Sequence, residues 1–307
     1  MSVKLVRSSK NPIIQPRPGL SWESLSTTNP GIVKSGKVIH ILYRAVDEHK
    51  ISSLGYATTV DGETILERPV QPVFSPTDPW EEWGCEDPRI THIEGEFYIF
   101  YTAYSRRGPR IAAASTTDFK SFTRYGIVGP DHDDKDCALF PGRIRGEFAA
   151  AHRIEPNIEL AFFDKIRKLD RHPRDPNSPS YLKRIESNVI MKPEKKWEAQ
   201  KVGIGPPPIR TDDGWLMIYH GVDANTTYRA GAALLDLEDP CRVIARTTEP
   251  ILEPEEDYER VGVVRNVVFP EGAVVMGDEL RVFYGGADRV CCTASVSMRV
   301  LMETLHG

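Results

Sequence analysis

The densest group of residues able to do chemistry is the segment Trp83-Gly84-Cys85-Glu86-Asp87-Pro88-Arg89. It combines an aromatic ring, two adjacent carboxylates, a cation and a proline that restricts the backbone. A carboxyl group buried near an aromatic ring can have a raised pKa and act as a general acid. The structural alternative is that Glu86 or Asp87 accepts turn hydrogen bonds or pairs with Arg89, because ion pairs in the framework also perturb pKa values. The segment alone leaves both interpretations open.

A second group consists of basic side chains that border predicted strands, with one hydroxyl group in the loop that follows. Its members are Lys135, Arg153, Lys201, His220 and Tyr228. Cations together with a hydroxyl group bind phosphate or carboxylate through charge-assisted hydrogen bonds. Any one of these residues alone is more often a solvated surface charge. Their shared position at strand ends favours a joint anion-binding role.

Other motifs exclude several kinds of site. Gly203-Ile204-Gly205 is followed by three prolines and so cannot open a helix as a dinucleotide fingerprint would. The acidic run 131–136 lacks the spaced ligands of an EF-hand, and we interpret it as a solvated loop without a metal. There is no Gly-x-Ser-x-Gly elbow and no His-Glu-x-x-His motif. We therefore expect no metal and no organic cofactor.

The strands that must position these residues are predicted from a recurring sequence pattern, here called the phrase. A glycine is followed by a short β-rich run that ends in an aromatic residue or a histidine, as buried strands do. These final residues are Tyr43, Tyr101, His152, Tyr219 and Tyr284. A proline that opens another short apolar run lies upstream of each phrase, and a third run lies downstream.

Five such units, each with a fourth outer strand, predict an all-β chain folded as a five-bladed β-propeller. We expect residues 1–307 to form a single catalytic domain, with an antiparallel sandwich as the alternative fold. A short charged helix over 164–171 and a long insertion over 164–192 are the main departures from the repeat. In a propeller the innermost strands deliver polar residues to a central channel. Asn29, Asp87, Lys201 and Asp288 are placed to converge there.

Composition narrows the function classes. The chain has 307 residues, a formal net charge of −5 and 27% charged residues, which is typical of a soluble globular protein. This balance disfavours nucleic acid and anionic membranes as partners. No apolar run reaches the length of a membrane helix, and no signal peptide is recognised. Five cysteines without a paired spacing favour the cytoplasm, and a homo-oligomer is compatible with the sequence.

The motifs resemble glycoside hydrolase family 130, which contains β-mannoside phosphorylases and β-mannosidases. The resemblance runs from about Asn29 to Asp288. It rests on the segments Gly84–Thr91, Leu139–Pro141, Gly203–Ile209, Tyr219–Gly221 and Tyr284–Asp288. It implies a five-bladed propeller that transfers a mannosyl group from a short β-manno-oligosaccharide to inorganic phosphate, with inversion to α-mannose 1-phosphate. Phosphate is then a co-substrate and no cofactor is needed.

The resemblance also implies residue roles. Asp87 matches the general acid, which protonates the glycosidic oxygen through the mannose 3-hydroxyl. Asn29, Arg44, Glu86, Arg89 and Asp288 match the substrate-binding positions. Lys135, Arg153, Lys201, His220 and Tyr228 match the phosphate-binding positions, with Arg143 as a competitor for Lys135.

Charge type separates the activities that the family allows. An inverting hydrolase needs a second carboxylate as the base that activates water, whereas phosphate is already an anionic nucleophile. The matched positions are basic, which favours phosphorolysis. The alternatives are an inverting β-mannosidase, with Glu147 or Glu155 as its base, and a non-catalytic propeller that binds carbohydrate. The sequence leaves β-1,2 and β-1,4 linkages, and the acceptor sugar, undecided.

Overall fold

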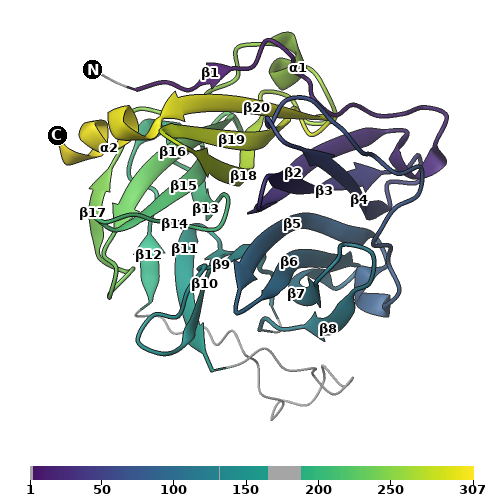
Figure 1. Ribbon diagram of the computed structural model, residues 1–307, viewed down its shortest axis with the longest axis horizontal. Coiled ribbons are helices and arrows are strands. Elements are labelled where there is room, and N and C mark those ends of the chain that lie inside the picture. Colours follow the sequence, from purple (N-terminus) through teal and green to yellow (C-terminus); the bar gives the residue numbers. More distant parts are fainter. Residues whose placement is uncertain (1–2, 131, 165–187) are drawn as a thin grey trace.

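A computed structural model describes residues 3–130, 132–164 and 188–307. The described chain is dominated by β-strands, so the all-β prediction is confirmed (Figure 1). Within these described ranges, helical structure is limited to α1 (Asp257–Arg260), α2 (Met298–His306) and three 3-10 turns, η1 (Ser21–Glu23), η2 (Pro79–Glu81) and η3 (Lys196–Glu198). The predicted helix over 164–171 and most of the insertion lie outside the described residues. Among the described residues, no helix is long and apolar enough to cross a membrane.

The strands follow the predicted repeats in five antiparallel groups. Group 1 contains β2 (Ser26–Ser35), β3 (Val38–Val46) and β4 (Ser52–Thr59). Group 2 contains β5 (Gly84–Ile93), β6 (Glu96–Ser105), β7 (Gly108–Thr116) and β8 (Thr123–Ile127). Group 3 contains β9 (Lys135–Leu139), β10 (Phe148–Ile154), β11 (Asn157–Phe163) and β12 (Val189–Met191).

Group 4 contains β13 (Lys201–Ile204), β14 (Ile209–Arg210), β15 (Trp215–Val222), β16 (Tyr228–Leu235) and β17 (Val243–Arg246). Group 5 contains β18 (Val268–Met276), β19 (Glu279–Gly286) and β20 (Val290–Ser297). Its fourth strand is β1 (Val6–Arg7), which pairs antiparallel with β20 and so joins the two ends of the chain in one sheet. Groups 1 and 2 are linked by a single parallel pair, Ser52 with Gly84.

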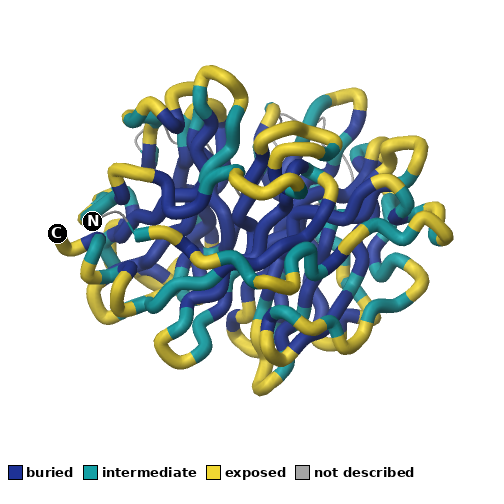
Figure 2. The backbone as a smooth tube through the Cα atoms, turned by 90° about the horizontal axis from the view of Figure 1, so that it is seen from above, coloured by how far each residue is buried: buried dark blue, intermediate teal, exposed yellow. Residues whose placement is uncertain are grey.

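The first strand of each group lies towards the middle of the molecule. In Figure 1, β2, β5, β9, β13 and β18 surround this middle, and the later strands of each group lie further out. Strand β5 contacts β2, β9 and β18, and β9 contacts β13. The buried residues are concentrated in the same central part (Figure 2). The first strand of each group is thus the innermost, and the prolines of the repeat lie within β2, β5 and β18 but just after β9 and β13.

The aromatic residue that ends four of the repeats anchors a buried ion network. The hydroxyl groups of Tyr43, Tyr101, Tyr219 and Tyr284 donate to the carboxylates of Glu23, Glu81, Glu198 and Glu259. Each glutamate ends a short turn or lies in one, and each also pairs with arginine. We call these the Tyr–Glu–Arg networks. In the remaining repeat, His152 contacts Asp134 at 2.8 Å instead.

Candidate active site

Four inner strands carry a β-bulge at the same level of the molecule. In β2, β5, β9 and β18 the register shifts so that one strand has one residue more than its partner. The unpaired residues include Asn29, Asp87, Asp136 and Glu271, and the first three have positive φ angles of 49°, 54° and 54°. A bulge redirects a side chain away from the regular alternation of the sheet. Polar groups from four strand groups are thereby brought to one region.

Asp87 lies at the centre of one half of this region. The amide Nδ2 of Asn29 donates to its Oδ1 at 2.8 Å, and the Arg44 guanidinium lies 3.5 Å from the same oxygen. Arg44 also pairs with Glu86 at 2.6 Å, and the Lys135 amine donates to the other oxygen of Glu86 at 3.2 Å. Asn29, Glu86 and Asp87 are all buried. Of the predicted substrate-binding residues, Asn29, Arg44 and Glu86 are thus joined to Asp87 and Lys135 in one cluster of hydrogen bonds and ion pairs.

The pKa of Asp87 is lowered in the folded protein, whereas the sequence left open whether a carboxyl group of this segment has a raised pKa. Burial acts to raise this pKa, but attraction to Arg44, Lys135 and Arg89, and the hydrogen bond from Asn29, outweigh it, so the pKa lies below its usual value. Of the two interpretations that the sequence left open, a raised pKa is not found for Asp87, because the cations that other strands supply outweigh the effect of burial. The isolated site therefore holds Asp87 ionised.

Arg89 is one of the largest fully buried side chains. Its Nε donates to the Gly205 carbonyl at 2.9 Å, and its Nη atoms donate to the carbonyls of Asp87 and Ile204 and to Asp136. These bonds fix the backbone at Asp87. We therefore propose that Arg89 positions the site, whereas the sequence suggested that it touches substrate.

Asp136 connects Arg89 to the predicted phosphate-binding side chains. Its Oδ2 lies 2.9 Å from Nε of Arg153 and 3.7 Å from Nε2 of His220. Asp134 and Asp136 are both buried. The interpretation of run 131–136 as a solvated loop was therefore wrong for these two carboxylates, because their long-range partners are invisible in local composition. Among the described residues no cluster suited to a metal ion is found.

The basic group gathers beside Asp136. Lys201 pairs with Oε1 of Glu155 at 2.6 Å, and Arg153 lies 3.7 Å from the same oxygen. His220 is fully buried, and neither of its ring nitrogens has a hydrogen-bond partner among the described residues. Its ring lies against Tyr228 and Phe269. An unpartnered donor beside cations is suited to an anion that brings its own acceptors.

His220 is neutral here, although the sequence grouped it with cations. Burial lowers its pKa to about 3, with repulsion from Arg153 and other cations acting in the same direction against the attraction of Asp136. Gly203 allows the close packing, since a Cβ atom there would lie 2.3 Å from His220 Cε1 and 2.8 Å from Asp136 Oδ2. Gly203, which cannot form part of a dinucleotide-binding motif, thus makes room for these two side chains.

Asp288 lies in the turn between β19 and β20, and its backbone carbonyl accepts a hydrogen bond from Ser26. Burial raises the pKa of Asp288 to about 6, and attraction to Arg44 only partly opposes this effect. Glu271 is fully buried, both of its oxygens lack a hydrogen-bond partner among the described residues, and it lies 3.9 Å from Arg89. Burial raises its pKa well above the usual range.

Two residues named as alternatives lie elsewhere. Arg143 is exposed and pairs with Glu94 at 2.6 Å, so it does not replace Lys135. Glu147 precedes β10, whereas Arg153 is near its other end, which at about 3.3 Å per residue separates them by roughly 20 Å. Of the two carboxylates considered as a base, only Glu155 is near the cations.

The sequence analysis missed Asp136, Glu271 and the glutamates of the Tyr–Glu–Arg networks. The glutamates had a local signal, an aromatic residue followed by glutamate, at 22–23, 80–81, 197–198 and 258–259. Asp136 and Glu271 had none, since their importance depends on bulges and distant partners.

Comparison with known proteins places the chain in a family. A family model described as beta-1,4-mannooligosaccharide phosphorylase, glycoside hydrolase family 130, matches residues 7–306. The chain belongs to this family. The family 130 resemblance predicted from the motifs is confirmed.

Curated family 130 relatives have closely related activities. The chain is 40% identical to a 1,2-beta-oligomannan phosphorylase of Thermoanaerobacter sp. (strain X514), over 97% of this chain and 98% of that protein. It is also 40% identical to a Beta-1,2-mannobiose phosphorylase of the same organism, over 93% and 94%. The solved Beta-1,2-Mannobiose phosphorylase from Listeria innocua, in complex with beta-1,2-mannobiose, is similar with a TM-score of 0.85 at 25% identity, covering 98% and 99%.

Proposed function

We propose that this protein is an inverting β-mannoside phosphorylase that cleaves short β-manno-oligosaccharides with inorganic phosphate and releases α-mannose 1-phosphate. The observation that carries the proposal is the arrangement of two linked halves. Asp87, Asn29 and Arg44 form one half, and Arg153 and Lys201 gather in the other. Arg89 and Asp136 bridge them.

We propose a five-bladed β-propeller as the architecture, with residues 1–307 as one domain. Five antiparallel groups with their first strands towards the middle support it, as do the pairing of β1 with β20 and the likeness to the Listeria structure. Closing the chain by pairing its two ends in one sheet protects strand edges that would otherwise be free.

In the proposed reaction Asn29, Arg44 and Asp288 hold the mannosyl group that is transferred, with Glu86 fixing Arg44. Arg153, Lys201, His220, Tyr228 and Lys135 hold phosphate. A phosphate oxygen forms a bond to C1 as the bond from C1 to the glycosidic oxygen breaks. The proton for the leaving oxygen comes from Asp87 through the mannose 3-hydroxyl. Phosphate then needs positioning and charge compensation, not a base.

The lowered pKa of Asp87 fits this scheme if phosphate binds before the chemical step. The cations Arg44, Lys135 and Arg89 hold Asp87 ionised in the isolated site. A phosphate anion offsets nearby positive charge and so favours the protonated form of a neighbouring carboxyl group. Phosphate thus supplies the nucleophile and also helps to protonate the acid.

The hydrolase alternative depends on Glu155. It is the carboxylate near Arg153 and Lys201 that could activate water, but its Oε1 is 2.6 Å from the Lys201 amine. An ammonium partner stabilises the ionised carboxylate and weakens it as a base. The non-catalytic alternative is disfavoured by the enzymatic relatives.

We expect the enzyme to cleave β-1,2-linked mannosides in preference to β-1,4-linked ones. The two relatives at 40% identity are named for β-1,2-mannosides, whereas a Ruminococcus albus beta-1,4-mannooligosaccharide phosphorylase is 33% identical over 69% of this chain. Cytoplasmic location and a homo-oligomer stay predictions.

The test is a panel of β-1,2- and β-1,4-linked manno-disaccharides, each incubated with and without phosphate. Mannose 1-phosphate formed only with phosphate supports the proposal and identifies the linkage. Free mannose formed without phosphate favours the hydrolase with Glu155 as its base. No product from any disaccharide contradicts both.

A further inference from the structure

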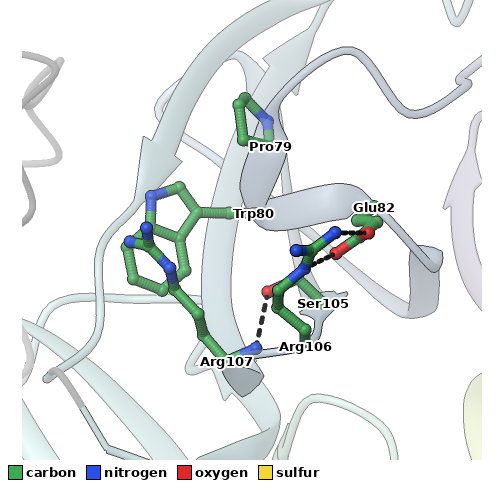
Figure 3. A pocket seen from close by; sticks show the side chains of 6 residues that line it. All are labelled: Pro79, Trp80, Glu82, Ser105, Arg106 and Arg107. Atoms are coloured by element: carbon green, nitrogen blue, oxygen red, sulfur yellow. Dashed lines mark hydrogen bonds and ion pairs between the residues drawn. The ribbon is translucent and has the colours of Figure 1, made fainter.

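A pocket of about 480 Å³ lies beside the start of β5, outside the site described above (Figure 3). It is lined by Pro79, Trp80, Glu82, Ser105, Arg106 and Arg107. In Figure 3 the Arg107 guanidinium lies over the Trp80 indole, 4.8 Å from the ring centre, and Arg106 pairs with Glu82. An aromatic ring bordered by hydrogen-bond donors and acceptors is suited to a neutral, hydroxyl-rich ligand.

Trp80 differs from the tryptophans at equivalent positions of the repeat. Trp22 and Trp197 stack on the tyrosine of their own Tyr–Glu–Arg network, with ring centres 6.4 and 5.6 Å apart, and donate their indole N–H to backbone carbonyls. In group 2, Phe74 packs on Tyr101 at 5.2 Å in place of Trp80. Within the described residues the Trp80 indole N–H has no hydrogen-bond partner, so Trp80 does not repeat the framework contacts of Trp22 and Trp197, although it packs against the hydrophobic core that contains Tyr101.

The pocket is on the same end of the sheet as Asp87. Turn η2 leads through Trp83 into the start of β5, and Gly84 pairs with Tyr104 at the end of β6, just before the lining residues of the hairpin. Trp83 is 41% exposed and contacts the Tyr104 ring at 5.0 Å. The Lys135 amine lies over Tyr104 at 5.2 Å and binds Glu86. A continuous series of contacts therefore connects the pocket to the proposed catalytic residues.

The geometry of the inverting step indicates which part of the substrate the pocket binds. In an inverting step the acceptor sugar departs on the side of C1 opposite the attacking phosphate. The proposed phosphate-binding residues Arg153, Lys201, His220 and Tyr228 come from groups 3 and 4, and Asn29, Arg44 and Asp288 come from groups 1 and 5. Group 2 carries the pocket and also Asp87, the proposed source of the proton for the leaving oxygen, so its loops lie on the acceptor side.

We propose that this pocket is a distal acceptor subsite that binds a mannosyl unit beyond the first acceptor residue, with Trp80 and the Arg107 guanidinium over its ring as one wall and with Arg106 and Arg107 as hydrogen-bond donors to hydroxyl groups. The inference rests on the proposed phosphorylase function and deepens it by assigning chain length. The enzyme then prefers oligomannosides of three or more units to the disaccharide.

The test compares kcat/KM with saturating phosphate for manno-oligosaccharides of two to five units, of the linkage that the enzyme cleaves. The wild-type value should rise with chain length, and Trp80→Ala should lower the value for the longer chains about tenfold while changing that for mannobiose less than about twofold. Arg107→Ala provides a second variant that leaves η2 intact and should also lose part of the preference. Arg299→Ala, an exposed arginine on α2, is the matched control and should change nothing.

Equal wild-type values for all chain lengths would overturn the subsite. So would a loss in Trp80→Ala that is the same for mannobiose and longer chains, or a full preference kept by both pocket variants. Turnover of mannobiose by the wild type reports the proposed function separately, so failure of the subsite is distinguishable from failure of the phosphorylase assignment. Binding of mannotetraose without phosphate, followed by calorimetry, should weaken by a similar factor in Trp80→Ala.

Discussion

Nδ2 of Asn29 donates a hydrogen bond of 2.8 Å to Oδ1 of Asp87, and this contact joins two β-bulges that are 58 residues apart in the chain. Both residues have positive φ angles and both precede a proline. The same device therefore occurs twice, and it turns an amide and a carboxylate towards each other. The predictions below test what this arrangement and its neighbours do.

Replacing Asp87 with Asn should lower kcat on manno-disaccharides by about 10²- to 10⁴-fold, because a general acid contributes a factor of that order. An aryl mannoside whose leaving group needs no proton should lose much less. Steady-state kinetics with both substrates measure the difference. Asp213→Asn, at an exposed carboxylate that contacts His306, is the control. Equal losses on the two substrates would contradict the assignment of Asp87 as the acid.

Replacing Glu155 with Gln should lower the KM for phosphate by about two- to fivefold. The Glu155 side chain is 60% exposed and its carboxylate holds Lys201 at 2.6 Å, so it competes with phosphate for the same cation. An exposed ion pair of this kind is worth up to about 1 kcal/mol, which sets the size of the effect. Kinetics at varied phosphate concentration measure it.

Glu194→Gln is the matched control for Glu155, since Glu194 is an exposed carboxylate paired with Arg246 at 3.3 Å. An unchanged or higher KM for phosphate in Glu155→Gln would show that Glu155 does not compete with phosphate. Loss of a phosphate-independent release of mannose would instead identify Glu155 as the base of a hydrolase.

Binding of a manno-disaccharide should weaken as the pH falls below about 6. The pKa of Asp288 is raised to about 6 by burial, so below this pH the carboxyl group is protonated and accepts hydroxyl hydrogen bonds less well. Affinity should fall by up to about tenfold for each pH unit. Calorimetry without phosphate, which itself titrates in this range, is the measurement. A profile that persists in Asp288→Asn would assign the pH dependence to another group.

The same raised pKa makes a separate prediction about folding. A carboxyl group titrates near pH 4 in an unfolded chain, so ionising Asp288 in the folded protein makes folding less favourable as the pH rises from about 4 through about 6. Asp288→Asn should remove this contribution. Denaturant unfolding at pH 4 and pH 7 should therefore show a greater stabilisation by the variant at pH 7, and an equal effect at the two pH values would contradict it.

Removing one hydroxyl group from a Tyr–Glu–Arg network should cost stability and leave activity unchanged. Tyr219→Phe leaves the buried Glu198 without the hydroxyl donor at 3.1 Å, although Arg246 remains at 2.7 Å. A partly unsatisfied buried acceptor costs about 1–3 kcal/mol in the free energy of unfolding. Denaturant unfolding measures this cost. Tyr125→Phe, at a half-buried hydroxyl group that contacts Ser115, should cost under about 0.5 kcal/mol. Equal costs would show that the network adds nothing.

Features that depend on near neighbours in the chain could be read from the amino-acid sequence. Alternating apolar residues, glycine turns and upstream prolines predicted the strands and their repetition, because strand formation depends on residues two positions apart. The five repeats correspond to five strand groups, although each group begins a few residues before the proline that marked its repeat. Motifs such as Glu86-Asp87-Pro88-Arg89 also predicted the family, since they are contiguous.

The charge state of the site was decided by tertiary structure alone. The sequence left the charge state of Asp87 open and grouped His220 with the cations, whereas the fold lowers the pKa values of both residues. It also turned two carboxylates of an expected solvated loop into buried partners of Arg153 and His152. These outcomes depend on burial and on charges contributed by other strand groups, such as Lys135 on Glu86 across 49 residues. Local composition carries no record of such pairs, so only the folded chain determines which groups are charged and where an anion can bind.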